Sequence, residues 1–284
     1  MTGSVVYTLL LPFAIACAAY LVVKLSDFSP GSRYALCLIP CLAPGICWSG
    51  DTDGPDPQQY RTETGEQKTV PLADGSVVFL DVETDLKIVP LDEGYLIYLN
   101  EGQAAFHVGP APARTVTVQV NRSSIRTARS QVHVRRKADV VIVSVVEGDV
   151  RIMSETGKTN VAPAQPIRAG MGKRYIIGPD GTVSGPVETS MWRITSWRER
   201  RLAFRDSTLA EIAEEFNRYI KTPKLRVEGE VLKMKTLSAV FDADDPQGFL
   251  DYLSSDGRIE FDRPDPDLIV IRMRSRYGFA DVRY

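Results

Sequence analysis

Hydrophobic and polar residues alternate in short runs through the middle of the chain, between about Lys68 and Met153. A period of two places successive side chains on opposite faces of a strand, so it predicts strands with one buried face. The predicted strands are residues 77–80, 95–99, 115–120, 131–134, 140–146 and 150–153. Turn sequences separate them at residues 73–75, 92–94, 100–102, 137–139 and 147–149. The pattern predicts an all-β domain, either a sandwich or a solenoid-like stack of strands.

The pattern changes to mixed helices and strands from Trp197 onward. A helix is predicted to begin after Thr208, which forms a capping box with Glu211, and to end before Pro223. A second helix is predicted behind Asp245 as its N-cap. Strands are predicted at residues 202–204, 225–227, 237–241, 258–261 and 268–271. The order βαββαββ predicts a small α/β domain with both helices on one face of a sheet.

Residues 1–50 contain two apolar runs. Val5–Val23 carries no charge, and its nineteen residues would span roughly 28 Å as a helix, close to the thickness of the bilayer core. Tyr34–Trp48 is shorter and is interrupted by Pro and Gly. Two membrane spans, a single span and a cleaved signal peptide all remain open. If both runs span, the positive-inside rule places Lys24 and Arg33 in the cytoplasm and most of the chain outside it.

A polar stretch with Gly and Pro follows these runs and predicts a linker. The predicted domains are a transmembrane anchor at 1–50, a linker at 51–67, an all-β domain with an extension at 68–195, and a small α/β domain at 196–284. All four cysteines lie before residue 50 in apolar surroundings. This position favours packing cysteines over disulfides or a metal site.

Charge and residue content argue against several functions. The net charge is −2, which gives no general attraction to nucleic acid. His107 and His133 are the only histidines and lack neighbours at metal-ligand spacing, so we expect ordinary, half-exposed strand residues. The sequence has no nucleophile elbow, no phosphate-binding loop and no acid/base pair of carboxylates. We therefore expect no enzyme activity, no cofactor and no metal.

A basic stretch lies inside the predicted β-domain and consists of Arg122, Arg126, Arg129, Arg135, Arg136 and Lys137. Alternation along strands would place several of these side chains on one solvated face. Contact with lipid headgroups or with a partner protein is the alternative.

Four segments of the predicted β-domain form a recognisable set: Val70–Leu80 with its Asp-Gly turn, Leu99–Val108, Val145–Val150 and Ile167–Gly170. Together they resemble the FecR domain, and the resemblance implies a further strand at Thr84–Val89. Gln103 stands where the family prefers Glu, and residues 128–134 lack the family's Gly-Thr and Phe. The last part of the chain is similar to the region after that domain, through Trp197, Leu202–Phe204, the Phe-Asn-Arg-Tyr run at 216–219, and Leu237–Phe241. It looks like the short domain at the N-termini of secretins and TonB-dependent receptors.

The resemblance, which covers residues 68–284, implies a regulator in the inner membrane of a Gram-negative cell, with most of the chain in the periplasm. Such proteins relay a signal from a TonB-dependent siderophore receptor to a sigma factor. The family's cytoplasmic helical domain is not found before Val5. No residue therefore supports binding to a sigma factor. The start lies further upstream, or the inner partner is another protein.

The candidate partner-binding residues are Asn217, Arg218, Tyr219, Leu237, Val240 and Phe241. Arg218 and Tyr219 lie at a helix end, where a structural clamp onto a sheet is the first interpretation. An open strand edge in this domain could accept a strand from a receptor's signalling domain. The alternative function is an envelope scaffold or a carbohydrate-contacting β-protein, for which Tyr95 and Tyr98 are candidate aromatic platforms.

Overall fold

The computed structural model describes residues 56–109, 115–155 and 165–274. Contacts divide the chain into Met1–Thr52 and Asp53–Tyr284, and all described residues belong to the second unit. Both apolar runs predicted to form the anchor, and all four cysteines, lie outside the described residues. Within residues 56–274, apart from the two gaps, no helix combines the length and hydropathy needed to cross a bilayer.

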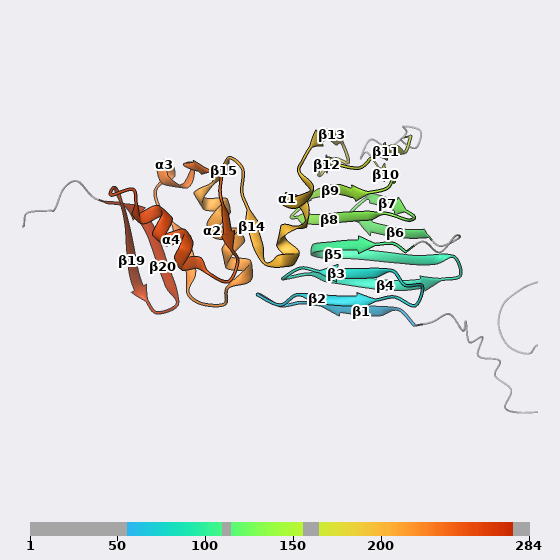
Figure 1. Ribbon diagram of the computed structural model, residues 1–284, viewed down its shortest axis with the longest axis horizontal. Coiled ribbons are helices and arrows are strands. Elements are labelled where there is room, and N and C mark those ends of the chain that lie inside the picture. Colours follow the sequence, from blue (N-terminus) through green and yellow to red (C-terminus); the bar gives the residue numbers. More distant parts are fainter. Residues whose placement is uncertain (1–55, 110–114, 156–164, 275–284) are drawn as a thin grey trace, which may run out of the picture. The chain divides into compact units, whose positions relative to one another are not determined.

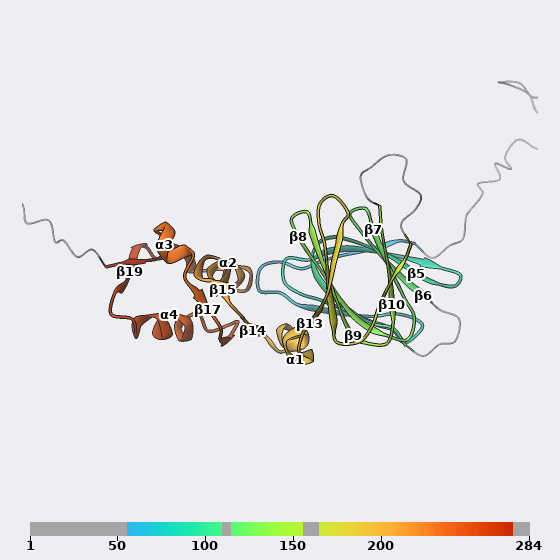
Figure 2. The same ribbon diagram turned by 90° about the horizontal axis from the view of Figure 1, so that it is seen from above.

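Thirteen strands form one sheet, which we name the β-domain (Figure 1). The strands are β1 Gln58–Arg61, β2 Lys68–Pro71, β3 Val77–Leu80, β4 Asp85–Leu91, β5 Gly94–His107, β6 Thr115–Val120, β7 Ser123–Thr127, β8 Gln131–Lys137, β9 Val140–Glu147, β10 Val150–Ser154, β11 Ile167–Ala169, β12 Lys173–Ile177 and β13 Val183–Glu188. Seen from above, the sheet curls until it is nearly closed (Figure 2). The prediction of a β-rich domain is confirmed, and the strands lie one above another along this nearly closed sheet (Figure 1).

Strand β5 connects the two halves of the sheet. Its first half, Gly94–Glu101, pairs with β4 and β6, and its second half, Gly102–His107, pairs with β3 and β8. Gly102 lies between the halves with φ +85°, and a Cβ there would lie 2.5 Å from the Glu83 carbonyl oxygen. Glycine is therefore required at this bend. The turn predicted at residues 100–102 is a bend within one strand.

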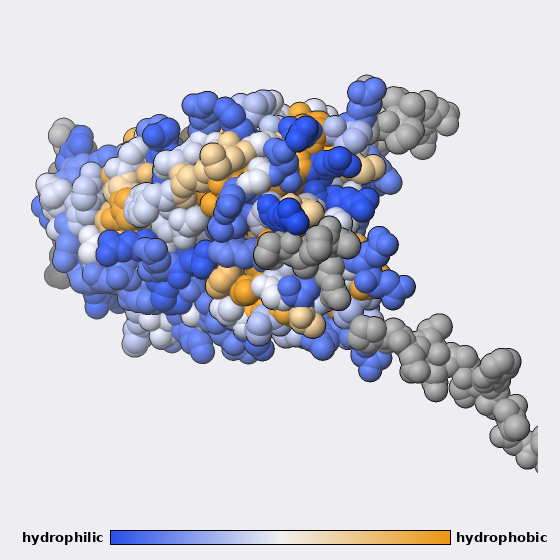
Figure 3. All heavy atoms as spheres, turned by 45° about the vertical axis from the view of Figure 1, so that its right-hand side comes forward, coloured by the Kyte–Doolittle hydropathy of each residue, from blue (hydrophilic) through white to orange (hydrophobic). Residues whose placement is uncertain are grey.

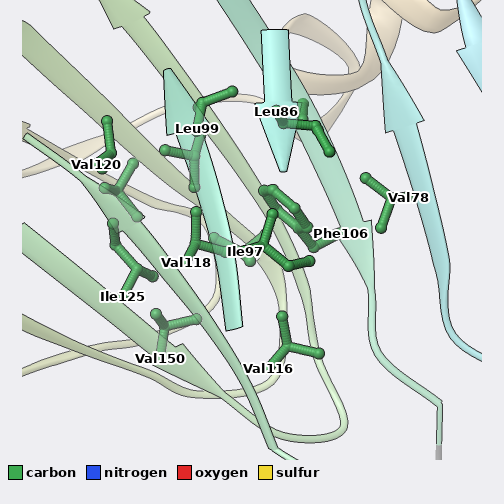
Figure 4. Close-up of a cluster of buried hydrophobic side chains, with 14 of the residues drawn as sticks. Val78, Leu86, Ile97, Leu99, Phe106, Val116, Val118, Val120, Ile125 and Val150 are labelled. Atoms are coloured by element: carbon green, nitrogen blue, oxygen red, sulfur yellow. The ribbon is translucent and has the colours of Figure 1, made fainter. Parts of the chain in front are cut away.

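The core of the β-domain is built from the alternate side chains of both halves. Val116, Val118 and Val120 of β6 point inward, and the residues between them are partly exposed. They meet inward-facing side chains from the other strands, including Leu86, Ile97 and Phe106 (Figure 4). Each such side chain contributes about 1.5–3 kcal/mol when it is fully buried, so the alternation seen in the sequence supplies the main stabilisation.

Two short helices, α1 Met191–Thr195 and η1 Ser196–Glu199, form a connecting segment after the β-domain. The C-terminal module, residues 201–273, follows. Its elements are β14 Arg201–Ala203, β15 Ser207–Thr208, α2 Leu209–Tyr219, β16 Lys224–Val227, α3 Glu230–Lys233, β17 Thr236–Leu237, β18 Val240–Asp242, α4 Pro246–Ser254, β19 Ile259–Asp265 and β20 Leu268–Met273. The capping box at Thr208 and the Asp245 cap of α4 are both confirmed. The two main helices therefore begin where the sequence predicts.

The strands of the C-terminal module differ from the prediction. They form three small sheets, β14–β18, β15–β17 and β16–β20–β19, instead of the single sheet that was expected. Aromatic rings fill the space between these sheets and the helices, with Phe216 and Phe249 stacked at 5.3 Å and Phe241 against Phe249 at 5.4 Å. A shared core of aromatic and aliphatic side chains, rather than one continuous ladder, therefore holds this module together.

The β-domain also begins earlier than predicted. Strand β1 lies inside the predicted linker of residues 51–67, where it pairs with β4 in antiparallel register. The sequence Gln58–Arg61 is polar, and three of its four side chains are exposed. A strand that buries so little of its side chains carries no alternating hydrophobic signal, so only its pairing with β4 identifies it.

Candidate functional site

The predicted residues at the end of α2 face the β-domain. The helix begins at the Thr208 capping box and presents Leu209, Ile212 and Phe216 to the core of its own module. One turn beyond Phe216, the Tyr219 hydroxyl donates to both carboxylate oxygens of Asp81, at 2.8 and 2.9 Å. Asp81 follows β3, and the two residues are only 0 % and 3 % exposed. The tyrosine therefore joins the two domains through a fully desolvated hydrogen bond.

Arg218 completes this contact. Its guanidinium donates to Glu215 at 2.9 Å and to the Val82 carbonyl at 2.8 Å, and it lies 3.7 Å from the Asp81 carboxylate. Arg135 of β8 binds the same Glu215 carboxylate with both terminal nitrogens. We name Asp81, Arg135, Glu215, Arg218 and Tyr219 the clamp. Every charge in it has an oppositely charged partner.

The surroundings of the clamp shift the pKa values of its groups. Burial raises the pKa of Asp81, although Arg218, Gln67 and Tyr219 oppose this rise. Burial also acts to raise the pKa of Glu215, but Arg135 and Arg218 outweigh it and the pKa is lowered. Glu215 is therefore the carboxylate that the two arginines hold ionised.

Asn217 is also used internally. Its side-chain amide donates to the Leu225 carbonyl at 2.8 Å and accepts from the Leu225 amide at 2.7 Å, which ties the end of α2 to β16. The clamp interpretation of Arg218 and Tyr219 thus fits the structure. Both residues bind the loop that follows β3. The polar groups of these three residues have partners within the chain. Their role in partner binding stays a prediction.

A second contact between the β-domain and the connecting segment is aromatic. The Trp197 indole donates to His133 Nδ1 at 3.0 Å, and His133 is only 3 % exposed. The expectation of a half-exposed His133 was wrong, because the connecting segment covers β8 at this point. Burial, aided by His107 and Arg198, lowers the pKa of His133 to about 3, while the Ile194 backbone opposes this effect. The imidazole is therefore neutral at physiological pH and carries its proton on Nε2.

His107 lies in an adjacent contact. The Arg198 guanidinium lies 3.9 Å from the centre of the Phe79 ring and 3.1 Å from His107 Nε2. His107 is partly exposed, as the sequence predicts. Its pKa is lowered by burial and by Arg198. Like Trp197, Arg198 therefore anchors the connecting segment to the β-domain, through cation–π contact and a hydrogen bond.

The other predicted residues, Leu237, Val240 and Phe241, lie on the short strands β17 and β18. Phe241 is partly buried among the aromatic rings of its module, and Leu237 is also partly buried. Val240 is 42 % exposed. On the face shown in Figure 3, apolar residues form small groups between hydrophilic ones rather than one wide patch. Of the three residues, Val240 is the one that a partner could reach most easily.

Strand β18 has one free edge. It pairs with β14 through Leu202–Phe241, and the flanking bonds Phe204–Ala239 and Ala243–Arg200 continue the same ladder. Because backbone groups alternate in an antiparallel pair, those of Val240 point toward the opposite edge. Among the residues that the structure describes, no strand pairs with β18 at that edge.

The alternative carbohydrate-contacting function loses one of its two candidate residues. Tyr95 is only 6 % exposed, so it cannot form the aromatic platform suggested for a carbohydrate-contacting protein; Tyr98 is more exposed. In the described part of the chain, no cluster of three or more His, Cys, Asp or Glu side chains could hold a metal ion. Asp244 pairs with Arg200, and Asp245 caps α4.

The functional residues that sequence reasoning missed are Asp81, Glu215 and Trp197 with its partner His133. Asp81 directly follows a buried leucine, and Glu215 lies beside the apolar stripe of α2, but neither position predicts its partner. Their roles depend on residues more than sixty positions away, as in the 64-residue separation of His133 and Trp197. The one available signal was a charged residue flanking a buried stripe.

The fold and these contacts define a two-part protein, a nearly closed β-domain clamped to a small α/β module. Residues 58–151 match the family model described as FecR protein, which supports assignment of the β-domain to that family. The sequence led us to expect no enzyme activity, and the match to the FecR model agrees with that expectation.

The chain is also similar to a candidate anti-sigma factor from Parabacteroides distasonis, known from crystal structures at 1.65 and 2.50 Å resolution. Each match has a TM-score of 0.63 at 18 % identity and covers 77 % of this chain and 100 % of that one. At this identity the likeness shows the fold. No curated protein matches the chain.

Proposed function

We propose that this chain is a FecR-like regulator that is tethered to the inner membrane by its apolar N-terminal residues. The described residues lie in the periplasm, where they receive a signal from the signalling domain of a TonB-dependent siderophore receptor. The signal passes toward a sigma factor through protein contacts. The match of residues 58–151 to the FecR family and the shared fold with a candidate anti-sigma factor support this proposal.

The free edge of β18 is the observation that carries the proposal. A strand edge with unpaired backbone groups accepts a strand from another protein, and the neighbouring side chains provide selectivity. Val240 is exposed beside this edge, and Phe241 and Tyr252 lie in ring contact at 6.0 Å, with Tyr252 also exposed. A partner strand added to β18 would therefore gain both backbone hydrogen bonds and apolar contacts.

Arg200, which is not part of the clamp, supplies a connection from this edge to the β-domain. Strand β18 pairs with β14, and Arg200, which immediately precedes β14, donates to the Gly65 carbonyl of the β-domain at 3.2 Å. Arg200 also binds Asp244, just after β18. Arg200 therefore links a strand that binds at β18 to the β-domain. Receptor binding at β18 would alter the contact that Arg200 makes with the β-domain, without a change in fold.

The test compares two substitutions at the same position in the full-length protein. Val240→Pro removes an outward-pointing amide without removing a bond to β14, whereas Val240→Thr keeps that amide and the branched side chain. A photo-crosslinker at Tyr252 reports the partner in intact cells. We expect a crosslink to a receptor signalling domain in the parent and in Val240→Thr, and its loss in Val240→Pro. Equal crosslinking in both variants, or none in the parent, would contradict the proposal.

Topology is tested separately. Alkaline phosphatase fused after residue 274 is active only when that residue lies outside the cytoplasm, and green fluorescent protein gives the complementary report. We expect phosphatase activity and no fluorescence. The opposite result would rule out the receptor relay. Loss of sigma-factor-dependent transcription on deletion of the gene, restored by the parent chain, tests the last step.

A further inference from the structure

A cavity of about 420 Å³ lies between the β-domain, the connecting segment and helix α2. Strands β8, β9 and β12 form one wall, and Ile194, Trp197 and Phe204 supply apolar surface on the other. This volume is within the range of small-molecule sites, which combine apolar walls with a few convergent polar groups. The cavity does not include the free edge of β18.

The lining of this cavity is strongly basic. Its basic members are Arg135, Lys137, Arg174, Arg193, Arg201 and Arg205, and its acidic members are Glu211 and Glu215. Both carboxylates are already engaged: Glu215 binds Arg135 and Arg218, and Glu211 accepts from the Thr208 amide in the capping box. Among the described residues, no carboxylate lies within ion-pairing distance of Arg174, Arg193, Arg201 or Arg205. The cavity therefore holds an excess of positive charge.

Three buried nitrogens in the same lining have no hydrogen-bond partner among the described residues: Arg174 Nε, Arg193 Nε and His133 Nε2. His133 is neutral and accepts from Trp197 at Nδ1, so its Nε2 carries a hydrogen that it can donate. All three atoms are therefore donors. The Ile194 backbone lies near His133. The two guanidinium nitrogens are therefore the donors that most clearly call for an acceptor, because buried donors are rarely left unpaired.

The pKa shifts of the cavity arginines also indicate that the cavity lacks an anionic partner. The pKa of the Arg174 guanidinium is lowered by burial and then by Arg193 and Arg135. The pKa of Arg193 is lowered by burial and by Arg205, with Asp206 opposing. These cations are crowded by one another instead of being neutralised. An anion in the cavity would relieve that repulsion in the low-dielectric interior.

We propose that this cavity binds a small oxyanion, a molecule of low mass that bears phosphate or carboxylate groups. Guanidinium groups recognise both groups through paired, charge-assisted hydrogen bonds. Arg174 and His133 would bind from the β-domain, and Arg193 from the connecting segment. The volume accommodates a small molecule and is too small for a folded partner. The ligand would link the two parts, so its binding favours the arrangement in which they are in contact. The site is independent of the proposed receptor contact.

Calorimetric titration of the purified full-length protein at low salt tests the proposal. The probes are inorganic phosphate, pyrophosphate and citrate, with glucose as the neutral control. We expect saturable binding of at least one anion, weakened about tenfold or more in Arg174→Gln and in Arg193→Gln, because each variant removes a charged donor. The matched control is Arg126→Gln, which makes the same charge change on an exposed arginine of β7. It should bind within about twofold of the parent.

The separate probes distinguish the source of the anion. Preference for pyrophosphate over citrate assigns a phosphate ligand, and the reverse assigns a carboxylate ligand. Vesicles of anionic phosphatidylglycerol test a lipid headgroup, and binding to vesicles alone would overturn the small-molecule site. No saturable binding by any soluble anion would also overturn it, as would equal loss in Arg126→Gln and Arg174→Gln. A thermal melt without anion shows that each variant is folded.

Discussion

The clamp and the cavity lie side by side where the connecting segment and α2 meet the β-domain, yet they treat charge in opposite ways. In the clamp, Arg135 and Arg218 share Glu215, and Tyr219 donates to Asp81, so each buried group has partners. In the cavity, Arg174 and Arg193 have buried nitrogens without any partner in the described structure. Arg135 belongs to both regions. The clamp therefore stabilises the fold through paired groups, whereas the cavity contains buried donors without an acceptor.

Arg218→Ala should produce the largest effect of the changes considered. It leaves the fully buried Asp81 carboxylate without its cation and Glu215 with only one. Removing one partner of a buried ion pair costs about 3–5 kcal/mol, and we expect a loss of that size in urea-induced unfolding. The control is Arg226→Ala, whose pair with Glu228 is exposed, with an expected loss of about 0–1 kcal/mol. Similar losses in both variants would mean that the buried clamp contributes no more to stability than an exposed ion pair.

Tyr219→Phe tests the hydrogen bond alone, because it removes only the hydroxyl that donates to Asp81. A hydrogen bond contributes about 0.5–1.5 kcal/mol, or about 1.5–3 kcal/mol when one partner is charged, so a loss of about 1–2 kcal/mol is expected. Tyr95→Phe is the matched control within the β-domain. A double-mutant cycle with Asp81→Asn should show coupling between the two sites. Additive effects would indicate that the two groups do not interact in solution.

The pH dependence of stability should report the buried histidine. The pKa of His133 is about 3 in the folded protein and 6.5 as a free group, so the unfolded chain binds an extra proton between these values. Stability is therefore complete above pH 6.5 and falls as the pH decreases. From pH 6.5 to 5 the loss is about 2 kcal/mol, at about 1.36 kcal/mol per unit.

His133→Asn keeps an acceptor for Trp197 and removes the titrating group, so most of this pH dependence should disappear. The pKa of His107 is also lowered, so His107→Asn provides the comparison and should remove a smaller share. Denaturant unfolding at several pH values measures both. An unchanged slope in His133→Asn would show that His133 is not buried in the neutral form.

Arg174→Gln should have the smallest effect on stability. The direction of the change in melting temperature distinguishes the cavity arginine from those of the clamp. In the absence of anion, loss of this crowded charge should leave the melting temperature unchanged or raise it slightly, since Arg193 and Arg135 no longer repel it. A saturating anion should stabilise the parent more than the variant, through its preferential binding to the folded state. A large destabilisation without anion would instead identify Arg174 as a structural residue.

Local sequence signals predicted much of the two domains. The strands at 77–80 and 115–120 have the predicted bounds, and the Thr208 capping box begins α2 as expected. These features depend on neighbours within a few residues. Strand β1, the continuity of β5 and the three sheets of the C-terminal module depend on pairing between distant residues, so they were missed or predicted differently.

The candidate site shows the same division. Val240 could be assigned to a strand from sequence, and Arg218 and Tyr219 could be recognised as unusual residues at a helix end. Their partners could not be predicted, because Asp81 lies 138 residues from Tyr219. Likewise, the basic residues of the cavity come from strands, helices and loops far apart in the chain.

By itself, the sequence determined the alternating core of the β-domain, the two main helices and the FecR-like motifs, because hydrophobic periodicity and capping act over a few residues. Tertiary structure alone decided which charges are neutralised and which remain unpaired. Burial and long-range proximity set those energies, and both arise only when the chain folds. Arginine residues of the same chemistry therefore have different roles. Those of the clamp form ion pairs, and those of the cavity lack an acceptor, because the fold places different groups beside them.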